Sequence, residues 1–200
     1  MNKQSTIYSM VFMFIVAFAF VFLLSLTNEA TQERVELNEE VERKRAILSA
    51  LSVEGLSDEE VLSRFEEVER LERDETTVFR STVDGETAFA KEFAGSGLWG
   101  TIEGVLGVNG DVSRTTGLEI IDHNETPGLG GRITEGWFQE QFAGERIGSE
   151  GIAFTAGDGD TDYDNAEVDG ITGATRTTES MERIINKEIE RLQSLVGGNA

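Results

Sequence analysis

The chain of 200 residues contains no cysteine, a single histidine (His123) and a single proline (Pro127). Without cysteine, this chain offers no disulfide, no iron–sulfur cluster and no thiolate-ligated metal. One histidine and no cysteine also leave little from which a hydrolytic triad is built. Several classes of metalloprotein and of covalent hydrolase are therefore excluded, and we predict no catalytic residue of those kinds.

Positive charge is also scarce, because 17 Lys and Arg stand against 38 Asp and Glu, which gives a net charge of −21. So acidic a chain argues against nucleic acid and anionic lipid headgroups as partners. The run 158–164 places Asp at alternating positions, as the start of a Ca²⁺-binding EF-hand loop does. However, Tyr163 stands where that loop needs glycine, and Asp169 stands where it needs glutamate. We interpret the run as a solvated surface loop and predict no metal site.

The longest uncharged segment lies near the N-terminus, where residues 7–26 are dominated by Phe, Val, Leu, Met and Ala. As a helix it would be about 30 Å long, enough to cross the hydrocarbon core of a membrane. A cleavable signal peptide is the alternative, but its apolar region is normally shorter and ends at a small-x-small site. Residues 27–32 provide a poor cleavage site, so we predict an uncleaved anchor.

The orientation of the anchor is not favoured by the flanking charges. By the positive-inside rule, Lys3 before the segment and the basic residues of 34–45 after it do not favour an exported domain.

Helices are expected next. Residues 28–51 hold apolar side chains among Glu and Arg without Gly or Pro, and residues 57–60 (Ser-Asp-Glu-Glu) form a capping box that begins a second helix. From residue 76 the pattern changes towards strands. Turns at Asp84-Gly85 and Asn109-Gly110 predict two hairpins. The expected strands and short helix comprise residues 78–83, 87–93, 98–108, 112–122, 134–142 (the helix) and 151–155.

Glycine-rich residues 98–108 indicate a close approach of another backbone. Apolar residues at spacings of three and four from Met181 to Val196 predict a C-terminal helix that starts near Thr177 or Thr178 and ends at Gly197-Gly198.

The expected fold is α+β, with a single N-terminal transmembrane helix followed by antiparallel strands and a docked C-terminal helix. The expected parts are an anchor (1–27), a helical stalk (28–75) and a ligand-binding domain (76–200).

The most informative segment is 169–175 (Asp-Gly-Ile-Thr-Gly-Ala-Thr). It combines an acidic residue, small residues that let a bulky ligand approach the backbone, and a hydroxyl just before a helix. The unpaired N–H groups and positive dipole end of a helix start would favour a phosphate beside Thr175. An ordinary helix-capping turn is the alternative that spacing alone leaves open.

Segment 169–175 resembles the flavinylation motif of the FMN-binding domain family, and residues 123–130 (His-Asn-Glu-Thr-Pro-Gly-Leu-Gly) resemble its second motif. The resemblance covers the anchor, the helix after it and nearly all of residues 89–185. It implies FMN joined to Thr175 through a phosphoester, installed by a separate flavin transferase that uses FAD and Mg²⁺. Asp169 would then either be read by that transferase or fix the turn.

The resemblance implies an isoalloxazine ring whose redox chemistry the protein positions and tunes. Thr126 would donate a hydrogen bond, Leu129 would contact the ring face, and backbone N–H groups of the glycines of 128–131 would bond ring carbonyls. Trp99 is either a ring contact or a core aromatic residue, and His123 is expected to order the 125–130 loop. The expected cofactor-binding residues are Thr175, Thr126, Gly128, Leu129, Gly130, Thr172, Gly173, Ala174 and Trp99.

Residues 42–51 resemble the segment that follows the anchor in the family of C subunits of Na⁺-translocating NADH:quinone oxidoreductases. This implies a membrane-anchored FMN subunit that passes electrons between other subunits, with its FMN domain outside the cytoplasmic membrane. We expect no NADH oxidation by the chain alone, because no Gly-x-Gly-x-x-Gly turn joins an expected strand to an expected helix. The alternatives are the G subunit of an Rnf ferredoxin:NAD⁺ complex and a non-redox, membrane-tethered binding module.

Overall fold

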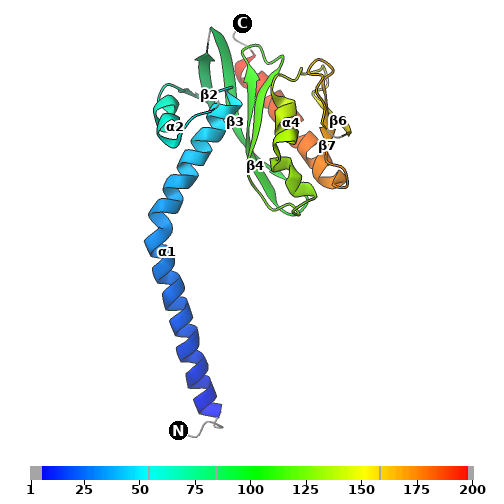
Figure 1. The fold of residues 1–200 in the computed structure, drawn as a ribbon. Coiled ribbons are helices and arrows are strands. Elements are labelled where there is room, and N and C mark those ends of the chain that lie inside the picture. The colour runs from blue at the N-terminus through cyan, green and yellow to red at the C-terminus, as the bar shows by residue number, and fades with distance from the viewer. Residues whose placement is uncertain (1–5, 54, 84, 158, 198–200) are drawn as a thin grey trace. The chain divides into compact units, whose positions relative to one another are not determined.

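The computed structural model describes residues 6–53, 55–83, 85–157 and 159–197 (Figure 1). Lys3, Asp84, Asp158 and Gly198, which took part in the predictions above, lie outside these ranges. The chain divides into two compact units, Met1–Glu40 and Val41–Ala200. Each unit is described by itself.

The first unit is helical and belongs to α1 (Thr6–Ala50). Between residues 6 and 40, nearly every side chain is exposed, including the Phe, Leu and Met of the apolar segment. Within the described residues, α1 is the one helix long and apolar enough to cross a membrane, by length and composition. The expected apolar helix is therefore present, and it continues through the segment that we expected as a stalk helix.

The second unit is built on a five-stranded antiparallel sheet in the order β1-β2-β3-β4-β5, and it holds a separate parallel pair, β6 with β7. The prediction of antiparallel strands with a docked C-terminal helix is confirmed. The elements after α1 are α2 (Asp58–Phe65), β1 (Glu69–Arg73), β2 (Thr76–Val83), β3 (Glu86–Ser96), β4 (Thr101–Asn109), β5 (Thr115–His123), η1 (Gly130–Thr134), α3 (Gly136–Gln139), η2 (Glu140–Phe142), β6 (Ala153–Ala156), β7 (Glu167–Gly170) and α4 (Thr175–Val196).

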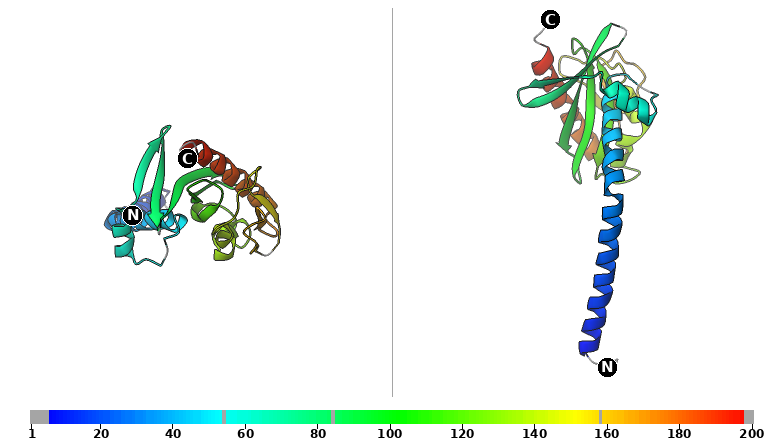
Figure 2. Two further views of the ribbon diagram at one scale, coloured as in Figure 1. Left: turned by 90° about the horizontal axis from the view of Figure 1, so that it is seen from above. Right: turned by 90° about the vertical axis from the view of Figure 1, so that its left-hand side faces the viewer.

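The two faces of the sheet bury different helices, which Figure 2 shows in two further views. One face packs against the end of α1 and against α2, where Ile47 and Phe65 join Val105 of β4 in one core. The other face packs against α4, where Leu106 of β4 joins Ile185 in the larger core. Adjacent residues of β4 serve opposite cores because side chains alternate along a strand.

The glycines of β4 and β5 permit a close approach of the helix α1. A Cβ at Gly107 would lie 1.8 Å from the backbone oxygen of Ala50, and one at Gly117 would lie 3.1 Å from the Cα of Ala50. Thr116 Oγ1 also donates to the Ala50 carbonyl at 2.6 Å. The expected close backbone approach is confirmed, and its partner is the last turn of α1.

Two boundaries differ from those expected. The compact unit starts at Val41 and includes strand β1, whereas we placed the domain boundary at residue 76. Helix α4 begins at Thr175, not at Thr177 or Thr178, because Thr178 already donates its N–H to the Ala174 carbonyl at 3.0 Å. Thr175 is therefore the first residue of the helix.

Candidate functional site

Three loops come together at the start of α4: residues 97–100 between β3 and β4, residues 124–129 after β5, and residues 171–174 after β7. Thr177 Oγ1 in the first turn of α4 donates to Glu125 Oε2 at 2.6 Å. A Cβ at Gly173, whose φ is +82°, would lie 3.6 Å from Leu129 Cδ2. The two sequence motifs therefore form one surface, although residues 131–168 separate them in the chain.

Most of the residues that we expected to bind the cofactor line the open side of this surface. Leu129 is 46% exposed, and Trp99 is 69% exposed, so Trp99 is not a core aromatic residue. The other exposed members are Thr126, Gly128, Thr172, Gly173 and Thr175. Exposed apolar side chains beside an exposed hydroxyl at a helix start fit an aromatic ring that carries a phosphate.

Gly130 and Ala174 are buried and lie behind that surface. Ala174 packs in the core on which α4 rests. A Cβ at Gly130 would lie 2.4 Å from Thr177 Oγ1 and 2.8 Å from Glu125 Oε2. The small size of Gly130 therefore makes room for these two side chains, and this differs from the approach of a ligand that we expected at this position.

The four threonines of residues 171–178 are held differently. Thr177 donates its hydroxyl to Glu125, and the Thr178 hydroxyl accepts the Ile171 N–H at 3.0 Å. Thr172 and Thr175 are exposed. Among the groups that the structure describes, none forms a hydrogen bond with the hydroxyl of Thr172 or Thr175. The two accessible hydroxyls are therefore those of Thr172 and Thr175, and only Thr175 belongs to the helix.

Glu125 is the buried polar centre of the site, with 4% of its surface exposed. Its Oε1 accepts the backbone N–H groups of Leu98 at 2.7 Å and of Trp99 at 3.1 Å. Burial raises the pKa of Glu125, but the hydrogen bonds from Thr177, Trp99 and Leu98 outweigh burial and leave the pKa below its ordinary value. The carboxyl group is therefore ionised at neutral pH.

Glu125 was not among the residues expected at the site. It stands in the motif 123–130, but its role depends on donors 26, 27 and 52 positions away in the chain. No local pattern reports such contacts. The one available signal was the position of this acidic residue inside the motif 123–130.

His123 orders the loop that follows β5. Its Nδ1 accepts the Glu125 N–H at 3.1 Å, in the tautomer assigned to the ring. A Cβ at Gly131 would lie 3.3 Å from the His123 Cε1 atom, so the ring packs against the far end of the same loop. This contact supports the structural role that we expected for His123.

Asp169 fixes the loop between β6 and β7. Its Oδ2 accepts the Gly159 N–H at 2.9 Å, and its Oδ1 accepts the Thr155 hydroxyl at 3.2 Å. The Gln141 side-chain oxygen accepts the backbone N–H of Asp169 at 2.7 Å, and the Gln141 side-chain N–H donates to the Asp169 carbonyl at 3.1 Å. Of the two roles left open for Asp169, the geometry favours fixing the turn.

The acidic run between β6 and β7 binds groups of the chain itself. Asp160 Oδ1 accepts the Asp162 N–H at 2.9 Å, and Asp164 forms an ion pair with Arg114. Within the described residues, no group of three or more His, Asp or Glu side chains is arranged to hold a metal ion.

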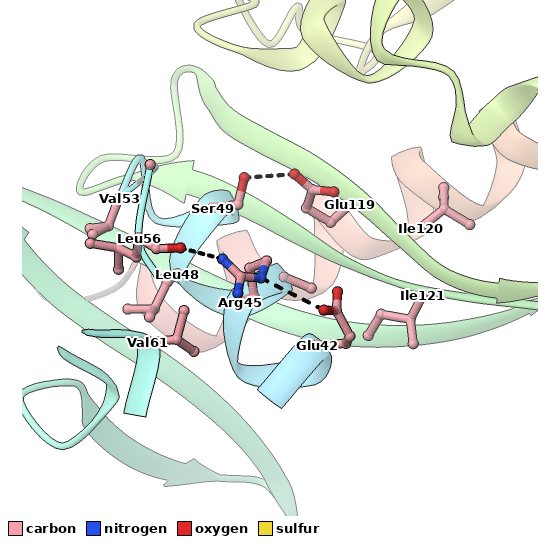
Figure 3. A pocket seen from close by; sticks show the side chains of 12 residues that line it. Glu42, Arg45, Leu48, Ser49, Val53, Leu56, Val61, Glu119, Ile120 and Ile121 are labelled. Carbon is pink, nitrogen blue, oxygen red and sulfur yellow. Dashed lines mark hydrogen bonds and ion pairs between the residues drawn. The ribbon is translucent and has the colours of Figure 1, made fainter. Parts of the chain in front are cut away.

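A separate cavity of about 350 Å³ lies between the end of α1, β5 and the residues Val53, Gly55 and Leu56 (Figure 3). Arg45 crosses it and donates to the Leu56 carbonyl at 2.6 Å and to Asp58 at 2.5 Å. Ser49 donates to Glu119 at 2.6 Å (Figure 3). None of the expected cofactor-binding residues lines this cavity.

Residues 97–190 match the FMN-binding domain family. The C subunit of the Na⁺-translocating NADH-quinone reductase of Pseudomonas aeruginosa is 30% identical in an alignment that covers 70% of this chain and 56% of that protein. The chain therefore spans about half the length of this relative. The G subunit of the ion-translocating oxidoreductase complex of Methanosarcina acetivorans is 26% identical in an alignment that covers 88% of each chain.

Two solved structures share the fold. The C subunit of the Na⁺-translocating NADH-quinone reductase of Parabacteroides distasonis superposes with a TM-score of 0.70 at 22% identity, covering 84% of this chain and 98% of that one. The Shewanella oneidensis NqrC structure gives a TM-score of 0.66 at 22% identity, covering 76% and 92%. At this identity, the likeness supports the arrangement of strands and helices alone.

Proposed function

We propose that the chain is the membrane-anchored, FMN-carrying subunit of an ion-translocating oxidoreductase complex, and the match of residues 97–190 to the FMN-binding domain family supports this proposal. The observation that carries the proposal is the exposed Thr175 hydroxyl at the first position of α4. Glu125 connects the first turn of this helix to the turn that carries the exposed Trp99, and the exposed Leu129 lies next to Gly173 in the loop before the helix. FMN bound there supplies reversible electron transfer, and the chain's own residues hold and orient it.

The proposed link is a phosphoester between Thr175 Oγ1 and the FMN phosphorus. A threonine hydroxyl is too weakly acidic to attack a phosphate unaided, so a flavin transferase would take FMN from FAD and release AMP. The unpaired N–H groups at the start of α4 would then stabilise the phosphate charge. The bonded Thr177 and Thr178 hydroxyls are unsuited to this reaction, and this supports Thr175 as the attachment site.

The remaining cofactor contacts follow from the exposed surface. Leu129 and Trp99 would cover the apolar ring, and Thr126 would donate a hydrogen bond to it. Thr172, Gly128 and Gly173 would lie along the phosphate and ring without obstructing them. Gly130 and Ala174 lie beneath the exposed surface, and their small size would let the loops and α4 pack closely.

The role of the C subunit in a Na⁺-translocating NADH:quinone oxidoreductase is the first candidate, supported by residues 42–51 and by the Pseudomonas relative. The role of the G subunit in an Rnf-type complex is the second, because the Methanosarcina relative aligns over 88% of both chains. In either complex the chain would pass electrons between cofactors of neighbouring subunits. Quinone-dependent oxidation of NADH by the purified parent complex favours the first role, and ferredoxin-dependent reduction of NAD⁺ favours the second.

The proposed anchor comprises residues 1–27, with the FMN domain on the outer side of the cytoplasmic membrane. The apolar, exposed first half of α1 supports a single span. The proposed side rests on the resemblance to outward-facing anchored FMN domains, since the charges flanking the span do not favour it.

Attachment at Thr175 is tested by co-expressing the full chain with a flavin transferase and measuring flavin fluorescence of the denatured band in a gel. The wild type and Thr172→Val should fluoresce, because the ester bond survives denaturation, and Thr175→Val should be dark. Thr172→Val is the matched control, since it removes the other accessible hydroxyl of the same loop. A fluorescent Thr175→Val band would contradict the proposed site.

A further inference from the structure

Glu125 connects the three loops of the cofactor site through one buried carboxylate. Oε1 holds the 97–100 turn by two backbone N–H groups, and Oε2 holds the first turn of α4 through Thr177. The N–H of Glu125 itself donates to His123, which fixes the third loop. Hydrogen bonds to an ionised acceptor are about twice as strong as neutral ones, so these contacts hold the loops firmly.

Two glycines leave the space that this carboxylate occupies. A Cβ at Gly97 would lie 2.4 Å from Glu125 Oε1, and a Cβ at Gly130 would lie 2.8 Å from Oε2. Neither glycine has the positive φ that would itself require glycine. Small residues therefore lie on both sides of the carboxylate, at two positions that are distant in the chain. This indicates that the fold reserves this buried space for the carboxylate.

The segments that Glu125 holds carry residues that face the proposed cofactor. Trp99 donates its backbone N–H to the carboxylate while its side chain stays exposed. Thr177 lies two residues after Thr175 in the same helical turn. Thr126 and Leu129 belong to the loop that begins with Glu125 itself.

We propose that Glu125 is the positioning residue of the flavin site, because its carboxylate sets the distances between Trp99, the 124–129 loop and Thr175. Glu125 itself lies behind these residues and touches no cofactor. The inference rests on the proposed FMN attachment. Removing the charge should leave Thr175 available to the transferase but let the ring-contacting loops separate.

The test uses the full chain with Glu125→Gln, Thr177→Val and the matched control Glu179→Gln. Glu179 is an exposed carboxylate of the same helical turn that bonds Arg176 alone among the described side chains. The first measurement is the backbone amide signal of Trp99 in the ¹⁵N-Trp-labelled chain without flavin. The chain has two tryptophans, so Trp137 serves as an internal reference.

We expect Glu125→Gln to move the Trp99 amide proton upfield, because it loses a charged acceptor, and to leave Trp137 in place. Glu179→Gln should change neither signal. The second measurement is the visible circular dichroism of flavin bound to each variant, which reports fixed, asymmetric surroundings of the ring. Glu125→Gln and Thr177→Val should lose most of this signal, and Glu179→Gln should retain it.

An unmoved Trp99 amide in Glu125→Gln would overturn the proposal, as would a moved amide with an unchanged flavin signal in both variants. Thermal melts of each variant identify any loss of folding, and Thr177→Val, which keeps the carboxylate, replaces Glu125→Gln if that variant unfolds. A wild type without flavin, despite an active transferase, would instead contradict the proposed function. The amide result on the flavin-free chain distinguishes these two failures.

Discussion

Glu145 is a second buried carboxyl group, and fewer hydrogen-bond donors contact its side chain than contact that of Glu125. It is 1% exposed, and its Oε1 accepts the Ala166 N–H at 2.8 Å. Burial raises the pKa of Glu145, with a further contribution from nearby Asp160, while the Ala166 N–H and Arg114 act in the opposite direction. The folded chain therefore resists the ionisation that the unfolded chain undergoes freely.

This raised pKa sets a pH dependence of stability. Because the folded-state pKa of Glu145 exceeds the unfolded value, its contribution to stability is fully present below the unfolded pKa and falls as pH rises through the folded pKa. Glu145→Gln should therefore be more favourable to stability at pH 7 than below the ordinary glutamate pKa, where the wild-type carboxyl group is itself neutral in both states. Denaturant unfolding at both pH values measures this, with the exposed Glu150→Gln as control. A gain that grows towards acid pH would contradict the argument.

At the residue scale, the sequence predicted the positions whose chemistry is local. Thr175, Leu129 and Trp99 were named from the sequence, and all three are exposed in the fold. Glu125 and the steric role of Gly130 were missed, because they depend on loops that meet only in the fold. A motif names residues, but it does not report which of them face a ligand and which face one another.

At the scale of elements, α4 is held on the sheet by an apolar face and by one buried ion pair. Lys91 of β3 and Glu188 of α4 lie 2.5 Å apart, and each side chain is 9% exposed. Such a pair offsets the desolvation of both charges, but either charge alone is costly. Since α4 carries Thr175 at its start, this pair contributes to the position of the proposed attachment site.

Lys91→Met should therefore destabilise the chain by about 3–5 kcal/mol, because it leaves Glu188 buried without its partner. The double variant Lys91→Met with Glu188→Leu should recover most of that loss. Urea unfolding of the two single variants and the double variant gives the coupling energy directly. Arg176→Met, which breaks the exposed pair with Glu179, serves as control and should change stability by less than about 1 kcal/mol. Additive single effects at Lys91 and Glu188 would refute the coupling.

Element types were predicted best where the apolar period was strong. The C-terminal helix and both hairpins were expected from their patterns and are present. Strands β1 and β7 were missed, because each is short and holds one large apolar residue, Leu71 or Val168. They form because neighbouring strands β2 and β6 offer backbone partners, and this information is absent from the local sequence.

At the scale of the whole molecule, the proposed orientation is tested by determining on which side of the cytoplasmic membrane the second unit lies. The chain has no cysteine, so a single introduced cysteine reports its location without background. Glu150, the site of the Glu150→Cys substitution, lies in an exposed turn outside both cofactor motifs. In intact cells with the outer membrane permeabilised, a membrane-impermeant maleimide should label it. Labelling only after the inner membrane is disrupted would place the domain inside.

The central claim is that Thr175 carries FMN, and the intact mass of the chain tests it most directly. The full chain purified after co-expression with a flavin transferase should be heavier than the unmodified chain by one FMN less water. Fragmentation should place that mass on the peptide that contains Thr175. A wild-type chain of unmodified mass, with the transferase active on a control substrate, would contradict the account and leave a tethered, non-redox module.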